Sequence, residues 1–448
     1  MLNLKPKFEI GNLKSEILPM PTPEPYEPLR SHIAGVSVGA LAKQFGTPSY
    51  IYDAAKIVER AADLKQFDVI RFAQKACSNI AILDLLRRQG VVVDAVSTGE
   101  IHRALKAGYR PGNTKHPEIV YTADIFDRDS LETVVNLGIP VNCGSPDMID
   151  QLGERAPGRN ITLRINPGFG HGHSQKTNTG GEQSKHGIWH DQLDDCLRRA
   201  DRHGLAITGI HMHIGSGTDL AHLAQVCGAM EKAARTVGRT ITAISAGGGL
   251  PTPYREGQTY VDIDQYFQLW DASRKRLEAE FGHPLTLEIE PGRYLVAESG
   301  YLLTEIRAIK QMGGNTFYLL DAGFNNLARP ILYGAYHPMS IGQASGMRQL
   351  PGTPPSQLRD VVVGGPLCES GDIFTQEEGG FVSKRPLPAA SVGDFLIIER
   401  AGAYGFVMAS NYNSKPFAPE VLIQNGQPHL IRSRQTPDDL IRGEIIPA

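Results

Sequence analysis

Cysteine is scarce and scattered in this chain of 448 residues, which contains only five. They are Cys77, Cys143, Cys196, Cys227 and Cys368, and no two of them form a CxxC pair. An odd number of widely separated thiols argues against a disulfide framework and against a zinc site of the usual cysteine spacing. We therefore expect a protein of a reducing compartment, with a cytoplasmic location.

Long hydrophobic runs and a strong excess of either charge are also missing. No stretch approaches the roughly 18 apolar residues of a transmembrane helix, and the N-terminus lacks the apolar core of a signal peptide. The net charge of −3 provides no general reason to bind nucleic acid or an anionic membrane, so we expect neither partner. With 41% apolar and 21% charged residues, the composition is that of a soluble globular protein, and the length indicates two or three domains.

A regular alternation of short apolar runs and helix-like segments fills the first two thirds of the chain. The apolar runs start at Val69, Val91, Ile119, Ile139, Ile161, Ile207, Ile241 and Leu285. Segments such as residues 81–90 and 192–204 lie between them and close with glycine soon after basic residues, as helix C-termini tend to. Because strand–helix alternation implies a parallel sheet, eight such units predict a (β/α)8 barrel rather than an open doubly wound sheet.

The pattern changes after Gly300. Strand-like runs separated by glycine and proline turns follow, with little helical periodicity, and they predict a mainly antiparallel β domain. We expect three parts: an N-terminal segment over residues 1–46 that packs with the β domain, a barrel over 47–300, and the C-terminal β domain over 301–448.

Polar residues and glycines gather where the predicted barrel strands end, which is the face on which such barrels carry their active sites. These residues are Lys75, Ser97, Glu100, Arg164, Asn166, His213, Ser216, Gly247, Gly248, Gly249, Glu290, Gly292 and Arg293. Lys75 raises a question, because a lysine at the end of a buried strand usually extends to water. The alternative is that its amine takes part in chemistry.

Two motifs near this face have both a structural and a functional interpretation. The triple glycine of residues 247–249 leaves backbone N–H groups uncovered, as a phosphate loop requires, although glycine clusters are commonly only turns. His211 and His213 share one face of a strand, where they are either hydrogen-bonded core residues or a partner for a flat cofactor. A third metal ligand is not evident in the sequence, so we expect no metal site.

Glu288 and Glu290 also share a strand face, and paired carboxylates are compatible with a hydrolase that uses two acids. Such an enzyme has no need of a lysine, a phosphate loop and Arg293. A strand-end lysine, a phosphate loop, a flat-ring partner and one acid together describe a pyridoxal phosphate site. In such a site the lysine forms a Schiff base, and the acid pairs with the pyridine nitrogen.

Several motifs carry a resemblance to a known family. They are "FAQKACSN", "HMHIGSG", "SAGGGLP", "EPGRYLVAESG", "DAGFNNLARPILYGAYH", "GPLCESGD" and "GAYGF". In this order they resemble the diaminopimelate decarboxylases of the bacterial lysine pathway, pyridoxal phosphate enzymes with an alanine-racemase-like barrel. The resemblance extends from about Gly46 to the C-terminus. The family more often has "YAxKAN" around its lysine, and Phe72, Cys77 and the inserted Ser78 depart from that pattern.

The resemblance implies roles at the cofactor. Lys75 would hold pyridoxal 5′-phosphate covalently in a buried position, His213 would stack on its ring, and Glu290 would keep the pyridine nitrogen protonated. The remaining residues around the phosphate and the ring would be Ser216, Gly248, Gly249, Gly292, Arg293 and Tyr404. Racemases on this barrel tend to place an arginine where Glu290 stands, so the acid favours decarboxylation.

The implied reaction converts meso-2,6-diaminopimelate to L-lysine and CO2, the last step of lysine biosynthesis. Substrate residues would be Arg293, Arg329, Tyr333, Glu369 and Tyr404. The two arginines and Tyr333 resemble a clamp on the distal carboxylate, because a guanidinium binds both carboxylate oxygens. Glu369 would face the distal ammonium. Cys368 would donate a proton, and it would reach with Glu369 into the site of a partner subunit, which implies an active homodimer.

Two alternatives stay open at this point. A related decarboxylase of the ornithine or arginine type would have no distal carboxylate to bind, which leaves Arg329 as a surface ion pair worth little energy. A catalytically inactive paralogue that regulates an active enzyme is the second alternative, although Lys75, Glu290 and Cys368 are all present.

The glycine-rich loop of residues 168–187 is interpreted as a mobile lid over the substrate.

Overall fold

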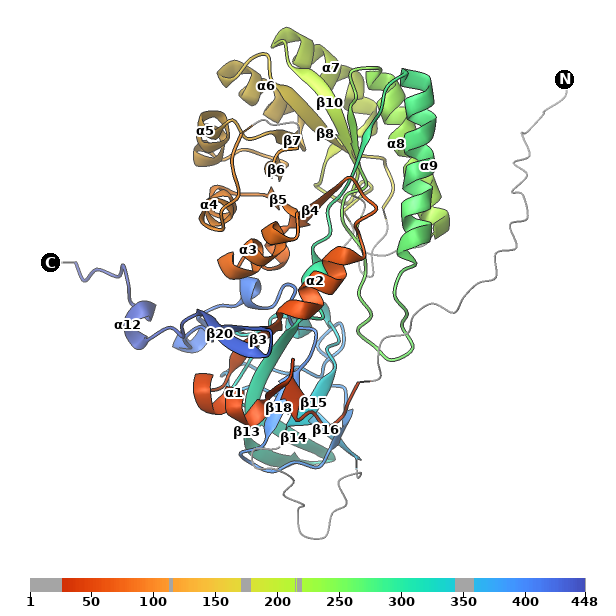
Figure 1. The fold of residues 1–448 in the computed structure, drawn as a ribbon. Coiled ribbons are helices and arrows are strands. Elements are labelled where there is room, and N and C mark those ends of the chain that lie inside the picture. Colours follow the sequence, from red (N-terminus) through yellow and green to blue (C-terminus); the bar gives the residue numbers. More distant parts are fainter. Residues whose placement is uncertain are drawn as a thin grey trace, which may run out of the picture.

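Eight parallel strands form a closed barrel in the computed structural model, which describes residues 26–112, 116–170, 179–213, 215, 220–342 and 358–447. These strands are β4 (Val69–Ala73), β5 (Val92–Ala95), β6 (Ile119–Ala123), β7 (Val141–Cys143), β8 (Asn160–Asn166), β10 (Ala206–His211), β11 (Ala243–Ser245) and β12 (Thr286–Ile289). The barrel closes because β10 pairs with both β11 and β8. The prediction of a (β/α)8 barrel is confirmed, with one strand at each of the eight apolar runs (Figure 1).

Helices surround the barrel as an outer ring. They are α2 (Ala54–Ala62), α3 (Ile80–Arg88), α4 (Thr98–Lys106), α5 (Arg128–Leu137), α6 (Pro146–Arg155), α7 (Leu193–Arg202), α8 (Leu220–Val237), α9 (Ile263–Phe281) and the single turn α10 (Arg293–Val296). Side-chain caps start several of them where the sequence offers an acceptor: Asn79 accepts from Ala81 N and Ser97 from Glu100 N. The cap at Asn79 ends the strand-to-helix connection that carries Lys75.

A second sheet forms the predicted β domain, which lies below the barrel in Figure 1. Its strands are β3 (Ser49–Asp53), β13 (Gly300–Met312), β14 (Asn315–Leu320), β15 (Met339–Gly342), β16 (Leu358–Gly364), β17 (Arg385–Pro388), β18 (Phe395–Ile398), β19 (Glu420–Gln424) and β20 (Gln427–Arg432). Most pairs are antiparallel, as predicted, while β14–β16 and β3–β19 are parallel. Strand β3 precedes the barrel in sequence but pairs with β13 and β19, and Leu29 bridges to Ile341. The domain boundaries at residues 46 and 300 stay predictions.

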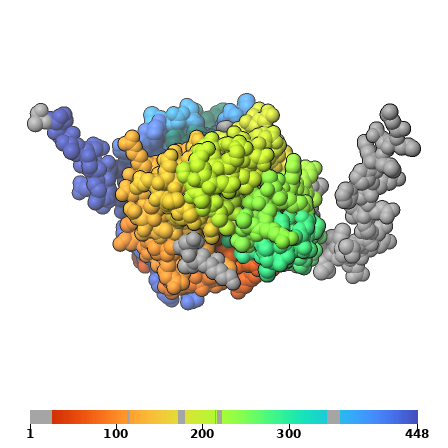
Figure 2. Space-filling model, turned by 90° about the horizontal axis from the view of Figure 1, so that it is seen from above, coloured from red at the N-terminus to blue at the C-terminus, as the bar shows by residue number. Residues whose placement is uncertain are grey.

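Short elements complete the fold. They are the hairpin of β1 (His32–Ile33) and β2 (Val36–Ser37), α1 (Val38–Phe45), β9 (Ile188–Trp189), α11 (Arg329–Tyr333) and α12 (Pro437–Leu440). The chain from α12 onward stands away from the body of the molecule in both Figure 1 and the view from above in Figure 2. Among the described residues, no helix is both long enough and apolar enough to cross a bilayer.

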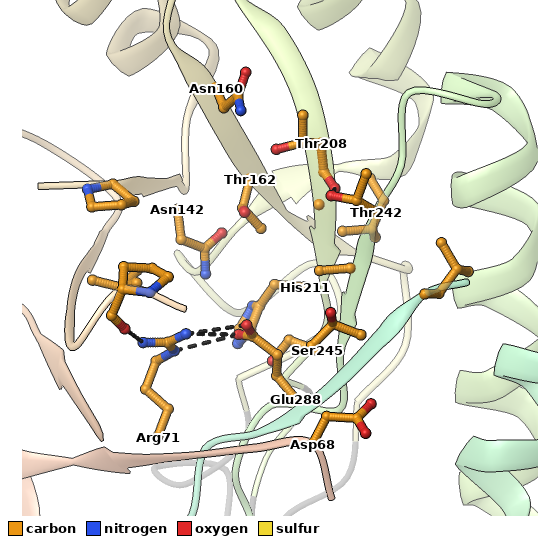
Figure 3. Close-up of a pocket in the computed structure, with 18 of the residues that line it drawn as sticks. Asp68, Arg71, Asn142, Asn160, Thr162, Thr208, His211, Thr242, Ser245 and Glu288 are labelled. Atoms are coloured by element: carbon orange, nitrogen blue, oxygen red, sulfur yellow. Dashed lines mark hydrogen bonds and ion pairs between the residues drawn. The ribbon is translucent and has the colours of Figure 1, made fainter. Parts of the chain in front are cut away.

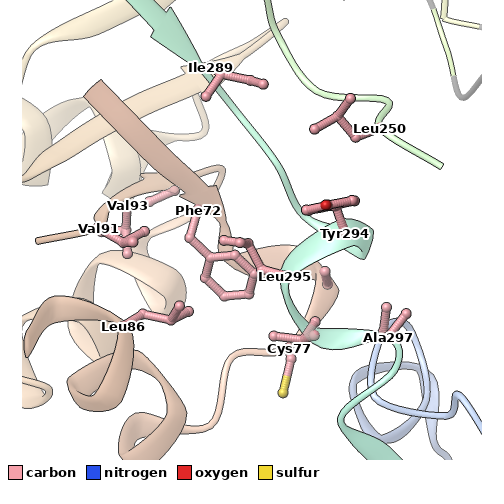
Figure 4. Packing of buried hydrophobic residues seen from close by; sticks show 14 of the residues in the cluster. Phe72, Cys77, Leu86, Val91, Val93, Leu250, Ile289, Tyr294, Leu295 and Ala297 are labelled. Atoms are coloured by element: carbon pink, nitrogen blue, oxygen red, sulfur yellow. The ribbon is translucent and has the colours of Figure 1, made fainter. Parts of the chain in front are cut away.

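The main hydrophobic core runs from the barrel into the β domain, so the two pack as one body. Figure 4 shows the part of the core around the end of β4, the first barrel strand, which includes Phe72, Leu86 and Leu295. Cys77 lies in this cluster with 2% of its surface exposed. Burial raises the pKa of its thiol to about 12, so this departure from the family pattern is a packing residue.

Candidate active site

One cavity of about 540 Å³ lies where the carboxyl ends of the barrel strands meet the β domain. Most of the residues predicted for the site line it: Lys75, His213, Gly248, Gly249, Glu290, Gly292, Arg293, Arg329, Tyr333 and Tyr404. The first seven follow barrel strands, and the last three come from the β domain. A volume of this size suits a cofactor and a small substrate together.

Lys75 lies in a single 3₁₀ turn, Gln74–Ala76, directly after β4. The turn is held from both sides, because Cys77 N donates to Gln74 O at 3.0 Å and Tyr404 N donates to Ala76 O at 2.8 Å. Gln74 and Ala76 are buried, whereas the Lys75 side chain is exposed. The side chain extends into the open cavity rather than into the core, and the expectation that Lys75 holds the cofactor in a buried position stays a prediction.

Close backbone packing requires glycine at two of the predicted positions in the cavity lining, Gly248 and Gly249, whereas Gly292 is less constrained. Gly249 has φ +102°, and a Cβ there would meet Gly215 O at 2.2 Å. A Cβ on Gly248 would meet Glu290 O at 2.5 Å, and one on Gly292 would come within 3.4 Å of Ala73 and Ala76. These positions bring bare backbone to the cavity wall, which is the arrangement that a phosphate-binding loop needs.

Glu290 is a buried carboxylate with two partners. His211 Nε2 lies 2.7 Å from its Oε2, and Ser245 Oγ donates to its Oε1 at 3.3 Å. Burial alone would raise the pKa of Glu290, but His211, Arg71 and His213 together outweigh burial and lower the pKa to about 2. Glu290 is thus ionised at any physiological pH. The sequence placed His211 on the same strand face as His213, but we did not predict its pairing with Glu290.

His213 has a different partner, since Gly248 N donates to its Nδ1 at 3.2 Å. Burial, followed by the charges of Arg164 and Lys75, lowers its pKa well below 6.5. A neutral imidazole that accepts a backbone N–H is a flat ring held in place, which suits stacking on a planar cofactor. The two histidines of the motif therefore serve separate groups.

Asp94, at the end of β5, lines the cavity and was not among the predicted site residues. Burial, and then the charge of Glu290, raises the pKa of its carboxyl to about 8, while Lys75 opposes the shift. Its Oδ1 atom has no hydrogen-bond partner among the described residues. The cavity thus contains a buried carboxyl with a raised pKa together with the amine of Lys75.

Two arginines form the part of the wall next to the β domain. Arg329 is buried with 7% of its surface exposed, and Arg293 is half-buried. Arg293 Nη1 donates to Tyr254 OH at 3.3 Å, and the Arg329 guanidinium lies 5.0 Å from the centre of the same ring. Among the described residues, neither arginine forms an ion pair with an acid. Two sheltered cations without an acidic partner are suited to bind an anionic ligand, and the surface ion pair considered for Arg329 is excluded by its burial.

Two predicted residues lie outside the lining of this cavity, and a third lies outside the described residues. Cys368 and Glu369 are exposed and lie outside its lining, and Cys368 N donates to Asn413 Oδ1 at 2.8 Å. Ser216 lies outside the described residues, as do residues 171–178 of the glycine-rich loop. The described parts of that loop on either side of this stretch are hydrogen-bonded to the end of β8, because Asn166 Oδ1 accepts from both Gly168 N and Gly181 N.

A second cavity of about 960 Å³ opens at the opposite end of the barrel (Figure 3). Arg71 enters it from β4 and donates to Glu288 Oε1 and Oε2 at 3.1 Å. The inner wall of the cavity reaches His211 and Glu290. Because Glu288 pairs with Arg71 and Glu290 pairs with His211, the two carboxylates do not act as the acid pair of a hydrolase.

The comparison with protein families matches residues 54–297 to the model of the pyridoxal-dependent decarboxylase pyridoxal binding domain. Among curated proteins, the diaminopimelate decarboxylase of Streptomyces coelicolor is 55% identical over 413 residues, which are 92% of each chain. The diaminopimelate decarboxylase of Escherichia coli strain K12 is 57% identical over 406 residues, covering 91% of this chain and 96% of that protein.

Solved structures agree in fold over nearly the whole chain. A crystal structure of a diaminopimelate decarboxylase superimposes with a TM-score of 0.88 at 55% identity, covering 93% of this chain and 99% of the other. The diaminopimelate decarboxylase from Helicobacter pylori complexed with L-lysine has a TM-score of 0.79 at 31% identity, with 90% of this chain and 98% of that chain covered.

Proposed function

Because the chain belongs to the family of the pyridoxal-dependent diaminopimelate decarboxylases, we propose that its 540 Å³ cavity is the active site and that its residues divide between cofactor and substrate. The enzyme decarboxylates meso-2,6-diaminopimelate to L-lysine and CO2 in lysine biosynthesis, with pyridoxal 5′-phosphate as cofactor. The observation that carries the assignment of the cavity is the presence around one space of Lys75, Glu290 and Arg329, a buried cation without an acidic partner among the described residues.

The residues present fit the cofactor. Lys75 supplies the amine for covalent attachment, Gly248 and Gly249 supply uncovered backbone for the phosphate, and His213 supplies a neutral ring to stack on. Bound pyridoxal phosphate supplies an electron sink for the charge that remains when CO2 leaves. Glu290 contributes by staying ionised, because a carboxylate beside the pyridine nitrogen keeps a proton on that nitrogen.

Arg329 and Arg293 hold the distal carboxylate of the substrate in this proposal. A guanidinium binds both oxygens of a carboxylate through parallel N–H groups, and its shelter from water strengthens the contact. Tyr333 and Tyr404 line the same cavity. Orientation by the distal group places the other end of the substrate at Lys75, so the clamp also decides which carboxylate is lost.

The first test is substrate choice. We expect CO2 release from meso-diaminopimelate and none from ornithine, arginine or lysine, because each of these has a single carboxylate and cannot occupy the clamp while a second carboxylate is lost. Arg329→Met should raise KM for diaminopimelate by about tenfold to a hundredfold, which is the usual worth of a hydrogen bond to a charged group. Trapping of isotopically labelled CO2 measures the turnover of each substrate and the KM of the variant. Turnover of ornithine equal to that of diaminopimelate would refute the clamp.

We further propose that the active form is a homodimer in which Cys368 and Glu369 complete the site of the partner subunit. Neither residue lines the cavity of its own chain, although both belong to a motif that resembles the family. Their exposure leaves them available for contact with a second copy. Cys368 would then donate the proton that replaces CO2, and Glu369 would face the distal ammonium.

Subunit mixing tests the shared site. Lys75→Ala and Cys368→Ala chains are each expected to be nearly inactive, and mixing them should restore up to about a quarter of the wild-type activity, because half of random dimers carry one intact site of two. The matched control mixes Lys75→Ala with Glu290→Gln, whose defects lie in the same half of the site. Recovery in the control, or none in the first mixture, contradicts a site built across two chains.

A further inference from the structure

His337 lies directly behind the proposed substrate clamp. It follows α11 in the chain and is fully buried, with 0% of its surface exposed. Arg329 Nη1 lies 2.9 Å from its Nε2, and Glu399 O lies 3.0 Å from its Nδ1. The imidazole therefore bridges the guanidinium of α11 and the backbone that follows β18.

The two partners decide the proton position on this ring. A backbone carbonyl can only accept, so Nδ1 carries the hydrogen. A guanidinium can only donate, so Nε2 presents its lone pair to Arg329. An imidazolium would place two donors against each other. His337 is thus a neutral hydrogen-bond acceptor for Arg329.

The surroundings hold the ring in this state. Arg385 Nη1 donates to His337 O at 2.8 Å, and the ring meets that of Tyr254 edge-on with centroids 5.3 Å apart. Glu399 is anchored through its side chain by Arg30 Nε at 2.9 Å. The charged groups that act on His337 are the arginines Arg329, Arg293 and Arg385, and with burial as the largest cause they lower its pKa well below 6.5.

We propose that His337 is a positioning residue that aims the guanidinium of Arg329 at the distal carboxylate of the substrate, and that it thereby sets the affinity for ligands that carry this carboxylate. The inference rests on the proposed function of the cavity. One N–H of Arg329 donates to His337, which leaves the other N–H groups of the guanidinium free to donate to the substrate. The Tyr254 ring, 5.0 Å from the guanidinium, supports the same orientation from the side.

Two amide replacements separate orientation of Arg329 from support of the fold. His337→Gln places an acceptor near the former Nε2 and loses the bond to Glu399 O. His337→Asn keeps a donor near the former Nδ1 and loses the acceptor for Arg329. We expect KM for meso-diaminopimelate to rise by about tenfold or more in His337→Asn and by less than about threefold in His337→Gln, with kcat nearly unchanged in both. His203→Asn, on the far end of α7, is the matched control.

Ligand binding provides a second readout that does not depend on turnover. L-Lysine keeps the distal carboxylate, whereas 1,5-diaminopentane has none. Calorimetry on the holoenzyme should show lysine binding weakened in His337→Asn by the same factor as KM, with 1,5-diaminopentane unaffected. In the wild type, protonation of His337 should add a rise in KM at acidic pH, and His337→Gln should lack this added rise.

The possible outcomes are distinct. If the wild type releases CO2 from diaminopimelate but His337→Gln is impaired more than His337→Asn, the ring only supports the backbone at Glu399 and the inference fails while the function stands. Equal weakening of lysine and 1,5-diaminopentane would also overturn it. Absence of CO2 release in the wild type refutes the proposed function itself. Thermal unfolding and the absorbance of bound pyridoxal phosphate verify that each variant is folded and loaded.

Discussion

Replacement of Lys75 by alanine is expected to abolish covalent attachment of pyridoxal phosphate and to lower CO2 release from meso-diaminopimelate by about four orders of magnitude or more, as loss of a covalent catalyst does. Lys75 is the amine at the end of β4 in the cavity, whose lining also includes Asp94 and Glu290. Alanine keeps the 3₁₀ turn, so the fold should be retained.

Borohydride reduction followed by peptide mass mapping measures this directly. In the wild type the phosphopyridoxyl group should be found on Lys75, and in Lys75→Ala it should be missing from the protein. Lys106→Ala, an exposed lysine on α4, is the control and should retain both label and activity. Label on another lysine of the wild type would disprove the cofactor assignment.

Replacement of Glu290 by glutamine is expected to lower kcat by on the order of a hundredfold to a thousandfold, the range seen when one electrostatic contact to the reacting system is removed. The amide has no charge to keep the pyridine nitrogen protonated. KM should change little, because Arg329 and Arg293 still bind the distal carboxylate. Steady-state kinetics on the fully loaded enzyme separate the two constants.

Glu288→Gln is the matched control, since it removes the neighbouring acid of the same strand. Glu288 pairs with Arg71 in the second cavity, so its loss should lower the melting temperature and leave most of kcat. Similar losses of kcat in both variants would show that Glu290 acts through the fold rather than through the cofactor.

The pKa of Glu290 also has a consequence for stability. Its folded-state pKa is depressed to about 2 from the ordinary value of 4.5, so the ionised form stabilises the folded protein. This contribution is fully present above pH 4.5 and is lost as the pH falls toward 2. Glu290→Gln should therefore flatten part of the acid limb of the stability curve.

The sequence determined the fold and the part of the site that follows the barrel strands. Apolar runs alternating with helical segments predicted the barrel strands, because the period of buried residues depends on local backbone geometry. Lys75, His213, Glu290 and the glycines were found because each directly follows a strand, and the carboxyl ends of parallel strands meet at one face. The resemblance to a family added Arg329, Tyr333 and Tyr404 from the β domain.

Only the tertiary structure decided which groups act on one another. The pairing of His211 with Glu290 joins residues 79 positions apart, and that of His337 with Glu399 joins residues 62 apart. The exposure of Lys75 and the raised pKa of Asp94 depend on the shape of the cavity between the two domains. Periodicity and strand ends are local properties of the chain, whereas burial, hydrogen-bond partners and charge interactions depend on distances between segments that only folding brings together.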